Sequence, residues 1–237
     1  MKRDIFKTGM IDSLPIALGY LAVSFSFGIA AVAAGLSPIE AIIISMTNLT
    51  SAGQFASIGI ITAGGSYFEL ALSQFIINLR YSLMGISLSQ KLDTSFSRKK
   101  CAALGFALTD EIFAVASSRH KPVTAVYFFG LAILPYIGWA GGTAAGAVFG
   151  TLLPDILCSA LSVAIYGMFI AIIVPAVQES YKVAIITLIA IAISCVIYYA
   201  PVFDRVSSGF SIIICAVVAS AIGAVIYPVR EEIADEQ

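Results

Sequence analysis

Charged residues are scarce in this 237-residue sequence: Asp, Glu, Lys and Arg together make up 11% of it, against about 25% in an average soluble domain. Residues of the AVILMFWYC set make up 59%. So few charges cannot cover a surface that faces water on all sides, and the composition predicts an integral membrane protein. The longest hydrophilic pieces, 90–100 and 229–237, are too short for a core of their own, so we expect one membrane domain over residues 1–237.

Metal-binding and catalytic patterns are also missing. The chain has one His and four Cys, and the isolated positions of Cys101, Cys158, Cys195 and Cys215 exclude the usual zinc and haem patterns. No Ser/His/Asp set and no phosphate-binding loop is present. The sequence therefore predicts neither an enzyme nor a metal or cofactor site. The net charge of −1 gives no indication of a nucleic-acid partner.

Long apolar blocks are what the sequence does contain, and two of them are interrupted. The eight blocks cover residues 13–34, 37–64, 67–89, 101–118, 122–150, 155–177, 183–201 and 208–228. The polar stretch 48–54 divides the second block into halves of roughly 11 residues, and each half reaches only about 16 Å at 1.5 Å per residue. Thr109-Asp110-Glu111 interrupts the fourth block in the same way. Neither block is expected to cross a bilayer core of about 30 Å.

The basic residues predict a topology, because cytoplasmic loops carry an excess of Lys and Arg. If 37–64 is a re-entrant hairpin from the outside and 101–118 one from the inside, the other six blocks cross the membrane and both termini are cytoplasmic. All Lys and Arg residues except Arg80 and Arg205 then lie inside. The predicted fold is all-α, with about six transmembrane helices and two broken helical hairpins.

A weak internal repeat is a further expectation. Pro15, Gly28 and residues 35–40 are echoed by Pro135, Gly146 and residues 150–156. Many secondary carriers are built from related halves and bind substrate where broken helices meet. If the repeat is real, block 155–177 re-enters the membrane instead of crossing it.

Arg80 lies near the middle of block 67–89. A cation at that depth costs about 2.5–3.5 kcal/mol on insertion scales and needs a partner. One interpretation is an anchor for a substrate carboxylate, because a guanidinium offers a planar fork for two oxygens. The other is a structural ion pair with Asp110, Glu111 or hairpin carbonyls.

Asp110 and Glu111 are candidate proton-coupling groups. On a continuous helix adjacent residues point about 100° apart, so one of them can pair with Arg80 while the other titrates. Burial favours the neutral carboxyl and brings its titration toward neutral pH. The alternative is a polar hairpin tip that faces cytoplasmic water.

The polar break in block 37–64 is a candidate substrate site. Unwound backbone at membrane depth is tolerated where it lines a wet cavity or is buried in protein, and a half-helix that starts near Gly53 would aim its positive dipole end at such a cavity. This suits a carboxylate; the alternative is a kinked, fully packed helix. The predicted substrate-binding residues are Arg80, Asn78, Asn48, Ser51, Gly53 and Gln54.

Several short motifs, in this order and spacing, resemble one known family. They are LPIALGY at 14–20, SFG at 26–28, SAGQF at 51–55, INLR at 77–80 and LTDE at 108–111. The chain resembles the AzlC family, the large subunits of branched-chain amino acid exporters, from about residue 6 to 227. That family often has His after the Asn-Leu-Arg motif, where this chain has Tyr81, so a proton relay through that His does not carry over.

The resemblance implies export of branched-chain amino acids, and in some members methionine, driven by the proton motive force. It also implies a small hydrophobic partner subunit of the AzlD type. We therefore expect a carrier in the inner (cytoplasmic) membrane that handles an amino acid and protons within the lipid bilayer. Phe25, Phe27, Phe55 and Ile58 are expected to form apolar walls for a branched side chain.

Two other classes of protein fit the same residues. Two opposed hairpins that meet in the membrane also describe a passive channel. A non-transporting membrane scaffold, in which Arg80 is only an ion pair, is the third possibility.

Overall fold

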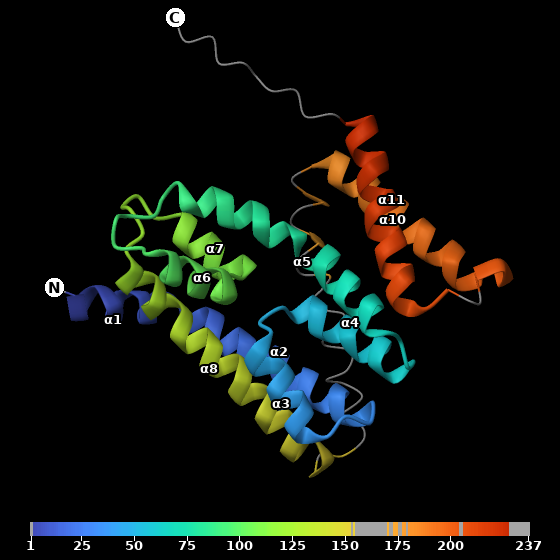
Figure 1. The fold of residues 1–237 in the computed structure, drawn as a ribbon, viewed down its shortest axis with the longest axis horizontal. Helices are drawn as coiled ribbons and strands as arrows, with labels where there is room; N and C mark the ends of the chain where they lie inside the picture. Colours follow the sequence, from blue (N-terminus) through green and yellow to red (C-terminus); the bar gives the residue numbers. More distant parts are fainter. Residues whose placement is uncertain are drawn as a thin grey trace, which may run out of the picture. The chain divides into compact units, whose positions relative to one another are not determined.

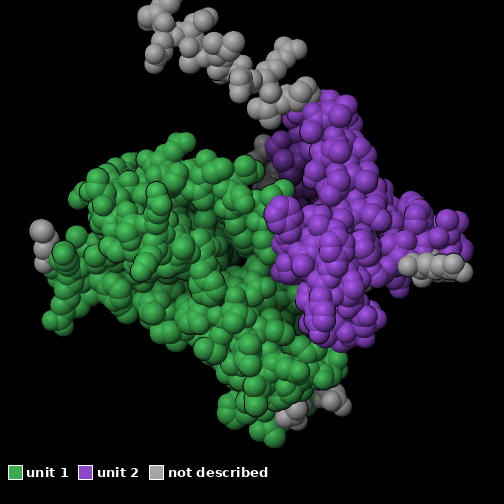
Figure 2. All heavy atoms as spheres, in the orientation of Figure 1, with its two compact units in different colours: residues 1–58, 77–167 green, residues 59–76, 168–237 purple. Residues whose placement is uncertain are grey.

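The computed structural model describes residues 2–152, 154, 170, 173–174, 177–178, 180–203 and 206–227. Within these ranges the chain forms helices and connecting loops, with one isolated bridge between Leu92 and Val123 and no β-strand. This confirms the predicted all-helical class. The chain divides into two compact units, residues 1–58 with 77–167 and residues 59–76 with 168–237 (Figure 2).

Three helices of the first unit pack side by side. Helix α1 (Lys2–Asp12) leads through the buried Ser13 into α2 (Leu14–Ala33), and both lie along α8 (Ala125–Phe149), as Figure 1 shows. Thr124 caps α8 by accepting a hydrogen bond from the amide of Tyr127. A short 3-10 turn, η1 (Gly150–Leu152), follows α8.

Glycines allow α2 and α8 to approach closely. A Cβ atom on Gly28 of α2 would lie 2.6 Å from the amide nitrogen of Ala147, and one on Gly146 of α8 would lie 2.8 Å from the carbonyl carbon of Phe25. Gly141, on another face of α8, has open space in the described structure. Membrane helices often pack closely where small residues face the neighbouring helix. The close α2–α8 contact therefore depends on Gly28 and Gly146, which face the partner helix, and not on Gly141.

The predicted hairpin segment 37–64 consists of two short helices. Gly35, with a φ of +96°, ends the turn after α2, and Ser37 and Glu40 form a capping box at the start of α3 (Pro38–Thr47). Helix α4 (Ser51–Thr62) follows after the three-residue break 48–50. The interruption lies within the polar stretch 48–54 that suggested it.

Segment 101–118 is divided in the same manner. Helix α6 (Arg98–Ala107) ends before Leu108, and α7 (Asp110–Ser117) begins after Thr109. The uninterrupted helix α5 (Tyr67–Ser89) precedes them. Leu88, Leu104 and Ile112 of α5, α6 and α7 share a buried apolar cluster with Phe128 of α8, which fixes the second break inside the first unit.

The second unit contains α10 (Tyr181–Tyr199) and α11 (Ser208–Ile226), which pack against each other, and the short turn η2 (Pro201–Phe203) between them. Glu69, at the start of α5, is buried. Its carboxylate accepts hydrogen bonds from the Ser207 hydroxyl and from the amide of Gly209, at 3.1 Å for the latter. An acidic group at a helix N-terminus offsets the helix dipole, so Glu69 stabilises the first turn of α11.

Four helices in the described ranges are long and apolar enough to cross a membrane: Leu14–Ala33, Ala125–Phe149, Tyr181–Tyr199 and Gly209–Ile226. Helix α5 is as long but carries Glu69 and Arg80. Most of block 155–177 lies outside the described residues, and so do Arg205 and the tail 228–237. The number of crossings, the membrane side of each loop and the internal repeat stay predictions.

Candidate functional site

The two broken helices border one small polar cavity in the first unit. Its volume is about 190 Å³, below the roughly 300–1,000 Å³ of pockets for drug-sized ligands, so it suits a small solute. The first break, the middle of α5 and the end of α6 supply its walls. The lining residues are Thr47, Asn48, Leu49, Thr50, Asn78, Tyr81, Gly105, Phe106 and Leu108.

Gln54 holds the first break together. Its side chain is fully buried, and its amide nitrogen donates hydrogen bonds to the carbonyl oxygens of Ile44 and Asn48. The hydroxyl of Ser45 donates to its amide oxygen at 3.5 Å and lies 2.6 Å from the hydroxyl of Thr143 on α8. The carbonyls at the end of α3 thereby gain partners that the broken helix cannot supply. Gln54 is therefore a positioning residue for the cavity wall.

The second break is joined to α5 by an ion pair. Thr109 caps α7 by accepting a hydrogen bond from the amide of Ile112, and the next residue, Asp110, pairs with Arg80: Oδ2 lies 2.8 Å from Nη2. The Asp110 and Arg80 side chains are 32% and 40% exposed, respectively, so the fold of this chain does not bury the pair completely. Arg80 also donates to the hydroxyl of Tyr81 at 3.4 Å, which connects the ion pair to a residue that lines the cavity.

Glu111 has a different partner from its neighbour. Its carboxylate accepts a hydrogen bond from the hydroxyl of Tyr20 on α2, and the Tyr20 ring packs edge-on against Trp139 of α8, with centroids 5.2 Å apart. Adjacent helical residues point in different directions, and here one carboxylate faces α5 while the other faces α2. The start of α7 is thus held from two sides.

The helix ends around the cavity differ in charge. Thr50 lines the cavity directly before α4, whose first turn has no acidic residue, so the positive end of the α4 dipole is not offset. Leu108 lines it close to the start of α7, whose first turn carries both Asp110 and Glu111. The α4 side of the cavity therefore favours an anionic group, whereas the carboxylates at the start of α7 are turned toward Arg80 and Tyr20.

Some of the predicted site residues line the cavity, and the others lie beside it or behind its wall. Asn48 and Asn78 line the cavity. Arg80 lies beside it, because residues 78 and 81 share a face of α5 and residue 80 does not. Ser51, Gly53 and Gln54 belong to the first turn of α4 behind the wall, where the Gly53 amide donates to the Thr50 hydroxyl at 3.2 Å.

The expected apolar walls are elsewhere. Phe27 and Phe55 pack edge-on, with ring centroids 5.4 Å apart, and belong with Ile58 to a core cluster behind the cavity. Neither they nor Phe25 line it; its apolar surface comes from Leu49, Phe106 and Leu108. These residues are therefore not walls of this cavity, because apolar side chains near a polar break can equally pack into the core; whether they contact a substrate stays a prediction.

Sequence reasoning assigned no site role to Tyr20. The hydroxyl of a Tyr in an apolar helix needs a polar partner when it is buried. This need is the only signal in the sequence for a contact such as the one between Tyr20 and Glu111.

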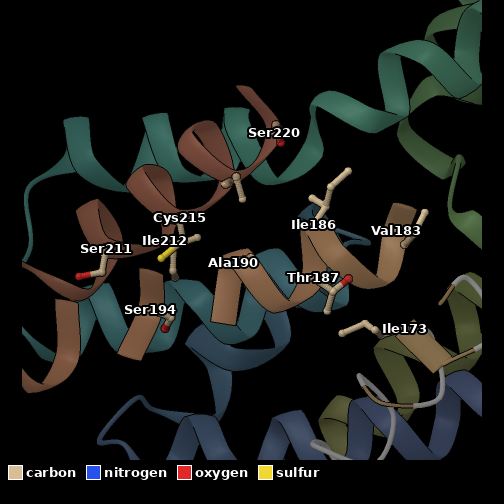
Figure 3. A pocket seen from close by; sticks show the side chains of 12 residues that line it. Ile173, Val183, Ile186, Thr187, Ala190, Ser194, Ser211, Ile212, Cys215 and Ser220 are labelled. Atoms are coloured by element: carbon tan, nitrogen blue, oxygen red, sulfur yellow. The ribbon is translucent and has the colours of Figure 1, made fainter. Parts of the chain in front are cut away.

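A larger cavity lies in the second unit, between α10, α11 and Ile173. Its volume is about 620 Å³, and Figure 3 shows Ile186, Ile212 and Cys215 among the side chains around it. Its polar groups are Ser and Thr hydroxyls and a thiol. Because its described lining offers no charged group, it matches a zwitterion less well than the cavity between the broken helices.

Comparison with known proteins gives membrane proteins throughout. The chain is 33% identical to the inner membrane protein YgaZ of Escherichia coli over 150 residues, 62% of this chain and 61% of that protein. An uncharacterized membrane protein of Archaeoglobus fulgidus is 30% identical over 81% of this chain and 85% of its own length. The branched-chain amino acid transport protein AzlC of Bacillus subtilis is 24% identical over 62% of this chain and 58% of its own length. The chain thus matches about three fifths of the length of the Escherichia coli protein.

No solved structure matches the chain. Residues 15–153 match the family described as AzlC protein. This segment is more than half of the sequence and contains both broken helices, the Arg80–Asp110 pair and the cavity. The chain belongs to the AzlC family.

Proposed function

We propose that this protein is the large subunit of a secondary transporter that exports branched-chain amino acids, driven by protons. The observation that carries the proposal is the small cavity between two broken helices, bordered by the start of α4, whose first turn has no acidic side chain, and lying beside the Arg80–Asp110 ion pair. Broken helices that meet at a cavity are a common substrate site in carriers. The name of the Bacillus subtilis relative supports the substrate class.

The amino acid substrate is a zwitterion, so it can replace Asp110 as the partner of Arg80 and Arg80 as the partner of Asp110. Its carboxylate takes the guanidinium of Arg80, and its ammonium takes the carboxylate of Asp110. Asn48 and Asn78 bind its polar end, and Leu49 and Phe106 contact its branched side chain. Binding thus replaces one ion pair within the protein by two ion pairs with the substrate. This favours binding of a substrate that carries both charges and disfavours binding of one that lacks either.

Proton coupling follows from the same exchange. A proton on Asp110 removes the charge that holds the substrate ammonium, so proton and substrate compete for one carboxylate. Competition of this kind couples inward movement of a proton to outward movement of the amino acid. In this proposal Glu111, bound to Tyr20, holds α7 in place, and a small hydrophobic subunit of the AzlD type completes the exporter.

Efflux from intact cells tests the function. Cells that contain this chain and its small hydrophobic partner subunit are fed dipeptides, and intracellular Leu, Ile, Val and Met are followed with and without an uncoupler. We expect faster efflux of the branched-chain amino acids than in cells without the two subunits, and loss of that difference with the uncoupler. Non-saturating efflux that the uncoupler does not change indicates a channel instead. Unchanged efflux of every amino acid, with both subunits present in the membrane, contradicts transport.

A further inference from the structure

A group of basic side chains in the first unit surrounds two pockets near the ends of the long helices. Lys91, shortly after α5, and the segment Arg119–Lys121, between α7 and α8, line one pocket of about 440 Å³. Arg119 and Lys121 also line a second pocket of about 610 Å³, together with Ile5 of α1, Asp93 and Thr124. Neither pocket contains a residue of the cavity between the broken helices.

Backbone contacts hold the two basic segments together. The amide of Val123 donates to the carbonyl of Lys91 at 2.8 Å, and the amide of Asp93 donates to the carbonyl of Val123 at 3.1 Å. Lys91 also donates to the carbonyl of Ser117 at the end of α7. The basic side chains are therefore fixed near one another by the fold, although like charges repel.

Within the described residues, Arg119 is held in place by an aromatic ring and has no anionic partner. Its guanidinium carbon lies 3.6 Å from the centroid of the Tyr127 ring, and its Nη1 is buried with no hydrogen-bond partner in the described part of the chain. The nearby carboxylates have other partners: Asp12 accepts from the Tyr127 hydroxyl at 2.7 Å, and Asp93 accepts from the amide of Ser95 at 3.0 Å. The Arg119 side chain lines both pockets, and no carboxylate neutralises its charge in the described part of the chain.

The pockets also lie at the start of α8. Thr124, which lines the second pocket, is the N-cap of this 25-residue helix, so the positive dipole end is directed toward the same region. Arginine forks and helix N-termini both favour phosphate oxygens, and basic pockets at the cytoplasmic ends of membrane helices are typical sites for anionic lipid headgroups.

We propose that Arg119 and Lys121, with Lys91 and His120 beside them, bind a phosphate group at the membrane surface, supplied by the headgroup of an anionic phospholipid. Ile5 of α1 and Pro122 give the pocket an apolar side for the first carbons of the lipid's acyl chains. The site is independent of the substrate cavity and does not depend on the transported solute.

Binding of fluorescent phosphatidylglycerol to the purified full-length protein tests this site. We expect the double variant Arg119→Gln/Lys121→Gln to bind this lipid roughly 25-fold more weakly, because each basic residue near an anionic lipid contributes about fivefold. The matched control is Arg98→Gln/Lys99→Gln, which removes the same two charges from exposed positions outside both pockets. Its affinity for the lipid should change less than twofold.

Three competitors identify the source of the phosphate. Unlabelled phosphatidylglycerol should displace the probe, whereas phosphatidylcholine should compete poorly because its choline cation faces the basic cluster. Inorganic phosphate at millimolar concentration should displace little if the ligand is a lipid; efficient displacement would identify a free phosphate as the ligand instead.

The exposed Lys121 provides a second variant in case loss of the Arg119 contact with Tyr127 prevents folding. Lys121→Gln alone should weaken lipid binding about fivefold. Equal weakening by the pocket variant and the control variant, or unchanged binding in both pocket variants, would overturn the proposal.

Discussion

Arg80→Ala is expected to lower leucine efflux by about 10- to 150-fold at limiting substrate, the range that corresponds to loss of hydrogen bonds to a charged group. The guanidinium lies 2.8 Å from the carboxylate of Asp110, and in the proposed cycle it binds the substrate carboxylate. Arg80→Lys keeps the charge but not the planar fork, so we expect an intermediate loss. The measurement is initial efflux rate against leucine concentration, with the amount of protein in the membrane determined for each variant.

A charge swap separates binding from structure. In Arg80→Asp/Asp110→Arg the ion pair can form again with its direction reversed. We expect the amount of folded protein to recover from that of the single variants, while efflux stays low because the substrate carboxylate now meets a carboxylate at residue 80. Full recovery of efflux in the swap would mean that the pair is only structural.

The second large effect concerns the contact between α2 and α8. Gly146→Ala is expected to lower the free energy of unfolding by about 1–3 kcal/mol, as overpacking of a core does, because a Cβ atom there would lie 2.8 Å from the backbone carbonyl carbon of Phe25. Backbone cannot move aside as a flexible side chain can. Thermal unfolding of the purified protein measures the change.

Gly141→Ala is the matched control, on the same helix and five residues earlier. Open space surrounds Gly141 in the described structure, and alanine is a better helix former than glycine by about 1 kcal/mol. We therefore expect opposite signs: Gly141→Ala leaves stability unchanged or raises it, and Gly146→Ala lowers it. Equal effects of the two substitutions would contradict the close packing of α2 on α8.

Much of the helix pattern was predictable from local sequence. The helix that begins at Leu14 and ends at Ala33 matches block 13–34, and the uninterrupted helix Tyr67–Ser89 matches block 67–89. The first break was predictable because polar residues and Gly interrupt an apolar run, and the second because Thr109 is a good N-cap followed by acidic residues. These signals act within one or two helical turns, which a single sequence displays.

The pairing of side chains across helices was less predictable. The sequence left Arg80 with several candidate partners, and Tyr20, 91 residues from Glu111, had none assigned. Which carboxylate faces which helix depends on how α2, α5 and α7 pack, and the glycine contacts of α2 with α8 contribute to that packing. The same reason explains why Phe27 and Phe55 pack into the core and do not line the cavity. The position of Asn48 and Asn78 in the cavity wall, by contrast, was predictable because amide side chains in apolar segments need polar surroundings; their binding of substrate stays a prediction.

The pH dependence of leucine binding shows whether substrate and proton compete for Asp110. Binding of labelled leucine to the purified protein and its small partner subunit is measured between pH 5 and pH 8, for the wild type and for Asp110→Asn. We expect wild-type binding to weaken as pH falls, by up to about tenfold per pH unit, the limit for competition with one proton. The Asn variant should bind leucine more weakly and with no dependence on pH. Wild-type binding of equal strength across this pH range, or the same pH dependence in both proteins, would contradict competition between substrate and proton for Asp110.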